Sequence, residues 1–451
     1  MGNTRDGQAD DGAGMEIQAG ARTDAGVSGV SGAARAAEAA GAAGKDSAVC
    51  QPILLDADTG VDDALAIALL LGAAPGRLIG VVASYGNVAQ SQAERNTREV
   101  LRLLGAGDIP VHAGSRAPSW ADGFVPDAAC AHFHGSNGLG GLDAKDYEPG
   151  ACADQRRERL RGALREARRE LPDSAAVQSA DARARAACAP VVSYGGYLPA
   201  DPAVQPDGVV APAGDGGGVD AIVAAVRRWG DALTLVTTGP LTDAAEAIRR
   251  DPAVAARLHI VAMGGAFLQQ GNCYDLTSET NIIQDPEAAA FVLRSGADVT
   301  LVGLDATHRC LCTPAMSRAV RAAAPGNAGV PDRHAASHAA RADFLADLMD
   351  VMIAANASVA PEFELGAPLH DPLAVAVALD PTLVRTLDLP MTVQCASGDG
   401  CGVRGRTVGD PMGLAKAVAG QDGVVQAHVA LDADCARFAR LFVDSLRRAA
   451  A

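Results

Sequence analysis

Four carboxylates, those of Asp56, Asp58, Asp62 and Asp63, lie within eight residues near the first strongly apolar run of the chain. The apolar run predicts a buried strand that stops at Asp56 and Asp58, and Gly60 predicts a turn before a helix that restarts at Asp62 and Asp63. Helix N-termini tolerate carboxylates, but four this close repel one another unless a cation lies among them. Hard oxygen ligands suit calcium or magnesium. The alternative is a helix cap followed by a solvated acidic turn.

The elements that must position these carboxylates begin at about residue 52. Short apolar runs alternate with helical segments, a pattern typical of a mainly parallel sheet with helices on both faces, and hence of the α/β class. The predicted strands after the first are 78–83, 233–237, 258–263 and 299–304, and the clearest helices are 92–104 and 286–294.

Polar residues or glycines follow each predicted strand. Asn87 follows the second strand, Thr238 the third and Met263 with two glycines the fourth, while Asp305 and His308 follow the fifth. Ligands of such sheets bind at the carboxyl ends of the strands. We therefore expect these residues and the carboxylates to meet at one edge.

Composition limits the classes of function. The chain has 451 residues, enough for one large or two ordinary domains, and a net charge of −16, which argues against a nucleic-acid partner. No apolar stretch approaches the roughly 18 residues of a membrane span, and the N-terminus lacks the features of a signal peptide. Ten cysteines without a CxxC pair fit a reducing compartment, so a cytoplasmic protein is expected.

Two regions differ from the alternating pattern. Residues 1–48 are rich in Gly, Ala, Asp and Ser without an apolar period, which predicts a disordered tail before a catalytic domain at 49–451. Residues from about 151 to 218 predict a surface insertion that opens with a charged helix over 154–170. Its arginines fit a solvated helix face better than a partner or an anionic ligand.

Several separated blocks together carry a resemblance to a known family. The blocks are LDADTGVDDA at 55–64, Asn87, 134–140, 238–242, 263–265, 279–281, 285–289 and 368–372. In order and approximate spacing they resemble the inosine-uridine preferring nucleoside hydrolases over about 52–448, apart from the insertion. The resemblance implies the nucleoside hydrolase fold and the hydrolysis of ribonucleosides to ribose and a free base.

The resemblance also implies a calcium site. Asp58, Asp63 and Asp371 would hold Ca²⁺ together with the backbone carbonyl of Thr238, and the ion would bind the ribose 2′- and 3′-hydroxyls and a water molecule. Asp58 matches the general base for that water. Asp56, two residues earlier on the same strand face, is expected to back the site.

Substrate contacts are likewise implied by the resemblance. His370, which precedes Asp371, matches a histidine beside the base that suits proton transfer, with a purely packing role as the alternative. His308 is expected to be structural. The substrate-binding residues implied are Asp62, Asn87, His134, Met263, Asn272, Glu279 and Asn281.

Some positions depart from the family pattern. The spacing from Asn272 to Glu279 is longer by one residue, and Thr280 stands where an aromatic residue is common. In the helix before His370, where the family often carries tyrosines that touch the base, this sequence has Met349, Met352 and Asn356. The preference for purine or pyrimidine is therefore left open.

Two other functions remain as alternatives. One is a nucleoside-binding protein that does not turn over its ligand. The other is a phosphatase of the haloacid-dehalogenase type, which also starts with an aspartate pair but needs a downstream lysine, and only Lys145 and Lys416 follow the motif. The expected partners are a small ribonucleoside and, by resemblance, further copies of the chain in a dimer or tetramer, with no nucleic acid and no membrane.

Overall fold

The computed structural model describes residues 51–126, 128–148, 150–169, 192–193, 217–273, 275–322, 333–396, 403–412 and 426–451. The predicted tail, 1–48, lies outside the described residues. Residues from Cys50 to Ala451 form one compact unit.

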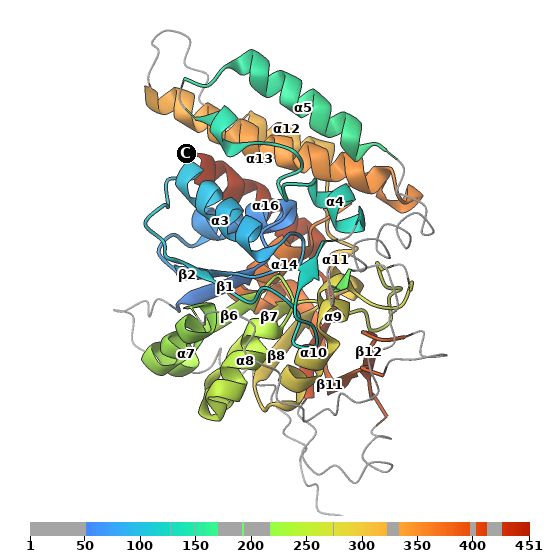
Figure 1. Ribbon diagram of the computed structural model, residues 1–451. Helices are drawn as coiled ribbons and strands as arrows, with labels where there is room; N and C mark the ends of the chain where they lie inside the picture. The colour runs from blue at the N-terminus through green and yellow to red at the C-terminus, as the bar shows by residue number, and fades with distance from the viewer. Residues whose placement is uncertain are drawn as a thin grey trace, which may run out of the picture. The chain divides into compact units, whose positions relative to one another are not determined.

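A nine-stranded sheet forms the centre of this unit (Figure 1). Its strands are β1 (Ile53–Ala57), β2 (Leu78–Ala83), β3 (Val111–Ala113), β6 (Thr234–Thr237), β7 (His259–Met263), β8 (Asp298–Val302), β11 (Val384–Val393), β12 (Thr407–Gly409) and β13 (Gln426–Ala433). Their order is β12-β11-β13-β8-β7-β6-β1-β2-β3. The pairs from β3 to β13 are parallel, whereas β13-β11 and β11-β12 are antiparallel. The predicted α/β architecture with a mainly parallel sheet is confirmed.

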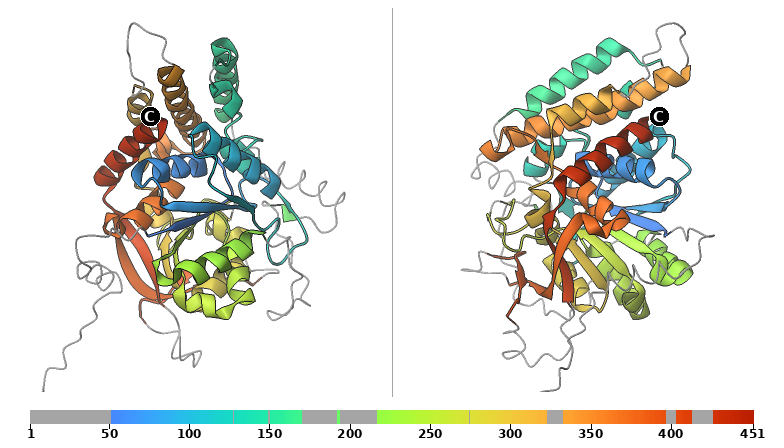
Figure 2. Two further views of the ribbon diagram at one scale, coloured as in Figure 1. Left: turned by 90° about the vertical axis from the view of Figure 1, so that its left-hand side faces the viewer. Right: turned by 180° about the vertical axis from the view of Figure 1, so that it is seen from behind.

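Helices cover both faces of the sheet, as Figure 2 shows. The helices are α2 (Val61–Ala73), α3 (Gln90–Leu103), α4 (Ala128–His134), α5 (Ala153–Ala167), α7 (Gly217–Trp229), α8 (Thr242–Arg250), α9 (Thr280–Gln284), α10 (Pro286–Arg294), α11 (Leu304–Thr307), α12 (Pro314–Arg321), α13 (Arg333–Ala357), α14 (His370–Leu379) and α16 (Cys435–Ala450). A large hydrophobic core joins the sheet to α2, α14 and α16, and a second joins it to α7, α8 and α10. Helix α2 is apolar on all sides because it lies between the sheet and two further helices.

Two short pairs of strands lie outside the central sheet. β4 (Phe124–Val125) pairs with β5 (Val192–Ser193) in parallel, and β9 (Leu311–Cys312) pairs with β10 (Ala367–Pro368) in antiparallel fashion. β10 leads directly into His370 and Asp371 at the start of α14. The β9–β10 pair therefore fixes the backbone from which those two side chains project.

The predicted charged helix of the insertion is α5, which ends three residues earlier than its expected boundary. Only Ala163 and Ala167 of this helix are buried, and α5 packs against α13. An ion pair of 2.9 Å between Arg156 and Asp343 joins the two helices. Most of the rest of the predicted insertion lies outside the described residues, and the boundaries 49–451 and 151–218 stay predictions.

The strand order brings the carboxyl ends of β2, β1, β6, β7 and β8 next to one another. The polar residues that the sequence predicts after these strands therefore share one edge of the sheet. Among the helices in the described ranges, none is long and apolar enough to cross a membrane.

Candidate active site

The turn between β1 and α2 carries the predicted acidic segment. Asp56 lies within β1 rather than after it, because the strand continues to Ala57. The Gly60 N–H donates to Asp63 Oδ2 at 2.8 Å, which closes the first turn of α2. A Cβ on Gly60 would overlap the His134 ring and lie 2.7 Å from Asn87 Nδ2, so only glycine fits here.

Asp62, Asp63 and Asp371 form a buried carboxylate cluster. Each offers an oxygen within 4.8 Å of the others, and all three side chains are buried. Burial, followed by repulsion from Asp62, raises the pKa of Asp63 to about 6. Burial and the neighbouring carboxylates raise the pKa of Asp371 well above its ordinary value. Such a group is costly without a positive charge between its oxygens.

Asn87 connects Asp58 to this cluster by hydrogen bonds. The Asn87 backbone N–H donates to Asp58 Oδ2 at 2.6 Å, and its Nδ2 donates to Asp58 Oδ1 at 3.1 Å and to Asp63 Oδ2 at 3.2 Å. Burial and repulsion from Asp63 raise the pKa of Asp58 well above its ordinary value. The tightest group of oxygens thus contains Asp62, to which the family resemblance assigns a sugar contact, whereas Asp58 lies beside that group.

Thr238 closes the site from the end of β6. Its hydroxyl donates to Asp63 Oδ1 at 2.6 Å, and its carbonyl accepts from Asn281 Nδ2 at 2.9 Å. Asn281 Nδ2 also donates to the Met263 carbonyl at 3.1 Å. The amide of Asn281 therefore holds the ends of β6 and β7 together beside the carboxylates.

Glu279 lies at the N-terminus of α9, where its carboxylate accepts backbone N–H groups. The donors are Gly265 at 3.0 Å, Asn281 at 2.9 Å and Ile282 at 3.2 Å. Asn272, by contrast, is exposed in the loop before α9, and its Oδ1 accepts from the Thr280 N–H at 3.1 Å. Of the predicted substrate residues, Asn272 has the least connection to the cluster.

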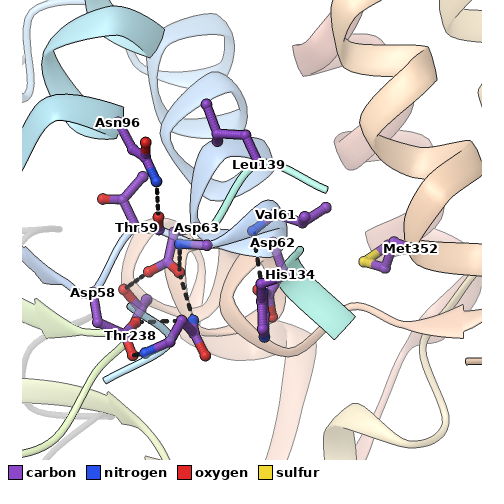
Figure 3. Close-up of polar contacts among 12 residues, drawn as sticks. Asp58, Thr59, Val61, Asp62, Asp63, Asn96, His134, Leu139, Thr238 and Met352 are labelled. Carbon is purple, nitrogen blue, oxygen red and sulfur yellow. Dashed lines mark hydrogen bonds and ion pairs between the residues drawn. The ribbon is translucent and has the colours of Figure 1, made fainter. Parts of the chain in front are cut away.

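His134, at the end of α4, contacts the first turn of α2 (Figure 3). Its Nδ1 accepts from the Val61 N–H at 3.2 Å and lies 3.7 Å from Asp62 Oδ1. Burial lowers the pKa of His134 to about 4, so the ring is neutral at neutral pH with its proton on Nε2. Met352 of α13 lies across from this ring in Figure 3.

His370 is the first residue of α14 and is partly exposed. Its Nδ1 is 2.8 Å from Thr307 Oγ1, and its ring centroid is 5.6 Å from that of His308. Burial and the adjacent His308 lower the pKa of His370 to about 3, in contrast to the near-neutral value expected of a free histidine. In this structure, His370 is therefore a neutral ring held by a hydroxyl, and His308 has a packing contact with it.

Sequence patterns missed a residue that supports both loops. Asn96 of α3 donates through Nδ2 to the carbonyls of Thr59 and Asn137, each at 2.9 Å. It joins the acidic turn to the loop after His134, as Figure 3 shows for Thr59. The only sign of Asn96 in the sequence is a polar amide on the apolar face of an amphipathic helix.

A second support lies behind Asp58. Tyr85 and Asp285 share the Thr242 hydroxyl, at 2.9 Å and 2.8 Å, and Asp285 also accepts from Ser119. The hydrogen bond between Ser119 and Asp285 alone joins residues 166 positions apart. No local pattern could have grouped them.

The chain is similar to known proteins in sequence and in fold. Residues 53–440 match the model of the family described as inosine-uridine preferring nucleoside hydrolase. The chain is 29% identical over 340 residues to the pyrimidine-specific ribonucleoside hydrolase RihA of Enterobacter sp. (strain 638), covering 75% of this chain and 82% of the relative. It is 28% identical over 343 residues to the inosine-uridine preferring nucleoside hydrolase of Leishmania major, covering 76% and 83%.

A solved structure is also similar. The purine-preferring ribonucleoside hydrolase from Gardnerella vaginalis superposes with a TM-score of 0.64 at 32% sequence identity, over 88% of this chain and 99% of that one. Nucleoside hydrolase structures of lower identity, such as the plant enzyme PpNRh1 at 23%, share the fold. The matched region includes every residue predicted for the site.

Proposed function

We propose that this chain, which belongs to the inosine-uridine preferring nucleoside hydrolase family, hydrolyses ribonucleosides in a calcium-dependent reaction at the carboxyl edge of its sheet. Family membership makes it a hydrolase of the N-glycosidic bond of ribonucleosides. The calcium ion, the roles of individual residues and the range of bases are the proposal. The observation that carries it is the buried Asp62–Asp63–Asp371 cluster.

The residues present fit a hard divalent cation. The cluster supplies only carboxylate oxygens, and Asp62 Oδ1 is buried without a hydrogen-bond partner. Calcium accepts about 6–8 oxygens in flexible geometry, so protein, sugar and water can share it. Asp58, Asp63, Asp371 and the Thr238 carbonyl would hold it, with Asp62 close by. When bound, the ion would hold the nucleophilic water and the ribose hydroxyls together.

Asp58 is the proposed general base. Both of its oxygens accept hydrogen bonds from Asn87, which fixes the carboxylate against the acidic turn. A carboxylate held in one orientation beside the bound water can accept a proton from it. In this role Asp58 takes a proton from the water that attacks the sugar C1′.

The sugar is assigned to residues around the cluster. Asp62 would accept from a ribose hydroxyl, because its Oδ1 otherwise has no hydrogen-bond partner. Asn281 has its amide nitrogen engaged by two backbone carbonyls, so its Oδ1 is the atom we assign to a hydroxyl. The remaining contacts are assigned to Asn87, Met263, Asn272 and Glu279.

His370 is the proposed donor to the leaving base. The neutral ring can carry its proton on Nε2 and offer it to a base nitrogen as a hydrogen bond. Full transfer of a proton uses the imidazolium form, in which Nδ1 donates to the Thr307 hydroxyl and Nε2 gives its proton to the base nitrogen, which returns the ring to its neutral form. His134, also neutral and close to Asp62, is the second candidate. The methionines of α13, Met349 and Met352, stand where the family often has tyrosines that touch the base.

Turnover of a substrate panel tests the proposal. The relatives include pyrimidine-specific and purine-preferring enzymes, so the panel contains inosine, adenosine, uridine, cytidine and their 2′-deoxy forms. We expect ribose and free base from ribonucleosides, loss of activity in a calcium chelator, and recovery when calcium is returned. Deoxynucleosides should be slower by as much as about 10⁴-fold, because a site built for a hydroxyl is left unpaired without it.

Other outcomes would support the alternatives. Tight nucleoside binding without any product would identify a binding protein, and phosphate release from a phosphorylated substrate would identify a phosphatase. Full activity in chelator, with no metal in the purified protein, would exclude the calcium mechanism but not the hydrolase. A homo-oligomer and a cytoplasmic location stay predictions.

A further inference from the structure

Two thiols from distant parts of the chain meet behind the active site. Cys310 lies in the turn between α11 and β9, and Cys435 is the first residue of α16. Their Sγ atoms are 3.0 Å apart although the residues are separated by 125 positions. Both are free cysteines in this structure.

Neighbouring contacts hold the two backbones side by side. Arg309, next to Cys310, forms an ion pair of 3.1 Å with Asp432, three residues before Cys435. The Cys435 Sγ also lies 3.5 Å from the Ala433 carbonyl. A disulfide has an S–S distance of about 2.05 Å, so closure requires the sulfurs to approach by only about 1 Å.

The two thiols differ in their access to solvent. Cys310 is 1% exposed, whereas Cys435 is partly exposed. Burial, contact with Cys435 and the nearby Asp432 and Asp434 raise the pKa of Cys310. Cys435 is therefore the thiol that meets a reagent from solvent, and Cys310 is the one that completes the bond.

We propose that Cys310 and Cys435 are a redox modification site that closes to a disulfide by exchange with a small-molecule disulfide. The Cys435 thiolate attacks the reagent, forms a mixed disulfide and releases one thiolate. Cys310 then loses its proton, attacks the Cys435 sulfur and releases the second thiolate. The protein loses two hydrogens, and the reagent accepts two electrons and is recovered as two thiols.

The bond would link two elements that support the catalytic edge. The Cys310 carbonyl accepts from the Leu369 N–H at 2.9 Å, directly before His370, and α16 packs against α2, which carries Asp62 and Asp63. Because the sulfurs are already close, closure should preserve the site. The bond closes a long loop, so it should raise the melting temperature by about 5 °C, chiefly through the unfolded chain.

The test uses the reduced full-length chain and oxidised glutathione as the reagent. After treatment, remaining thiols are blocked with N-ethylmaleimide and the protein is mapped by mass spectrometry without reduction. We expect a Cys310–Cys435 linked peptide, a melting temperature higher by about 5 °C and reversal of both by dithiothreitol.

Variants distinguish this pair from the other cysteines. Cys435→Ser should abolish the linked peptide and the rise in melting temperature, while its reduced form melts as the reduced wild type does. If the serine variant fails to fold, Cys435→Ala replaces it. Cys312→Ser is the matched control, since Cys312 is buried two residues from Cys310 and should not be needed for either effect.

Three results would overturn the proposal. One is glutathione that stays on Cys435 without a linked peptide, and another is a linked form that melts no higher than the reduced protein. The third is loss of the linkage in Cys312→Ser but not in Cys310→Ser.

Discussion

The sheet carries acidic residues near both ends of its strands, and the two groups are built in opposite ways. The carboxyl-end cluster, Asp58, Asp62, Asp63 and Asp371, is buried with no Lys or Arg among the contacts described for it. The amino-end cluster is a chain of alternating acids and histidines on β7, β8, β13 and β11. Its ion pairs are His259–Asp298 at 2.7 Å, Asp298–His428 at 3.0 Å and His428–Asp388 at 2.6 Å.

The pKa values move in opposite directions at the two ends. Burial and repulsion raise the pKa of Asp371, whereas His259 and His428 lower the pKa of Asp298. Asp298 and Asp388 raise the pKa of His428 to about 9 against the cost of its burial. The carboxyl-end cluster needs a cation from outside the chain. In the amino-end cluster, His259 and His428 supply the positive charge. We therefore expect aspartates to serve cation binding at the carboxyl end and stability at the amino end.

The largest expected difference is in turnover. Asp371→Asn should lower kcat/KM for a ribonucleoside by more than about 10⁴-fold, as removal of a member of a catalytic unit does elsewhere. Asp388→Asn, at the amino end, should change kcat/KM by less than about 2-fold. Steady-state assays of both purified variants provide the measurement, and comparable losses in the two variants would remove the functional distinction between the clusters.

The leaving group sharpens the assignment at the carboxyl end. His370→Ala should slow natural nucleosides by about 10²–10⁴-fold, the usual scale of proton transfer by a side chain. It should slow a p-nitrophenyl riboside far less, because nitrophenolate leaves without a proton, whereas Asp58→Asn should slow both. Equal slowing of both substrates by the histidine change would give His370 a supporting role beside Asp371.

Metal addition should distinguish the clusters by stability. Calcium at about 100 times its Kd should stabilise the chelator-treated wild type by about 2.7 kcal/mol. Asp371→Asn should respond little to calcium, yet melt no lower than the wild type in chelator, since it removes one of several repelling charges. Thermal denaturation with and without calcium measures this. In Asp388→Asn the calcium shift should persist, and its disappearance there would contradict independent clusters.

The smallest expected effect is the pH dependence from His428. Its folded pKa of about 9 lies above the unfolded value of about 6.5, so its contribution is full below pH 6.5 and is lost as the pH rises through 9. His428→Gln should cost up to about 1 kcal/mol at pH 6, because a partly exposed pair is screened. Urea denaturation at pH 6 and pH 10 should show the gap closing; a gap that is constant with pH would argue against this ion-pair contribution.

Local patterns were enough to predict the sheet edge. The second to fifth predicted strands match β2, β6, β7 and β8 within two residues, because short buried parallel strands are continuous apolar runs. The exceptions are at boundaries. Asp56 lies inside β1, and Leu304 begins the short helix α11 rather than ending a strand.

Contacts between distant residues were beyond those patterns. The contacts of Asn96 and Cys435 could not be predicted from the sequence. Their partners lie 37 and 125 residues away, and no periodic pattern links them. The antiparallel edge formed by β11 and β12 was also not predicted. Polar and apolar residues are mixed along these strands and do not form a continuous apolar run. The roles of the site residues stay predictions, because they depend on groups that the chain itself does not contain.

The packing around Gly60 limits how sequences of this kind can diverge. Any side chain there would overlap His134 and crowd Asn87, although the three residues lie in separate segments of the chain. A substitution at position 60 therefore requires space to be made at both His134 and Asn87. The turn bearing the carboxylates and the loop bearing His134 are therefore sterically dependent on each other, even though 73 residues separate Val61 from His134.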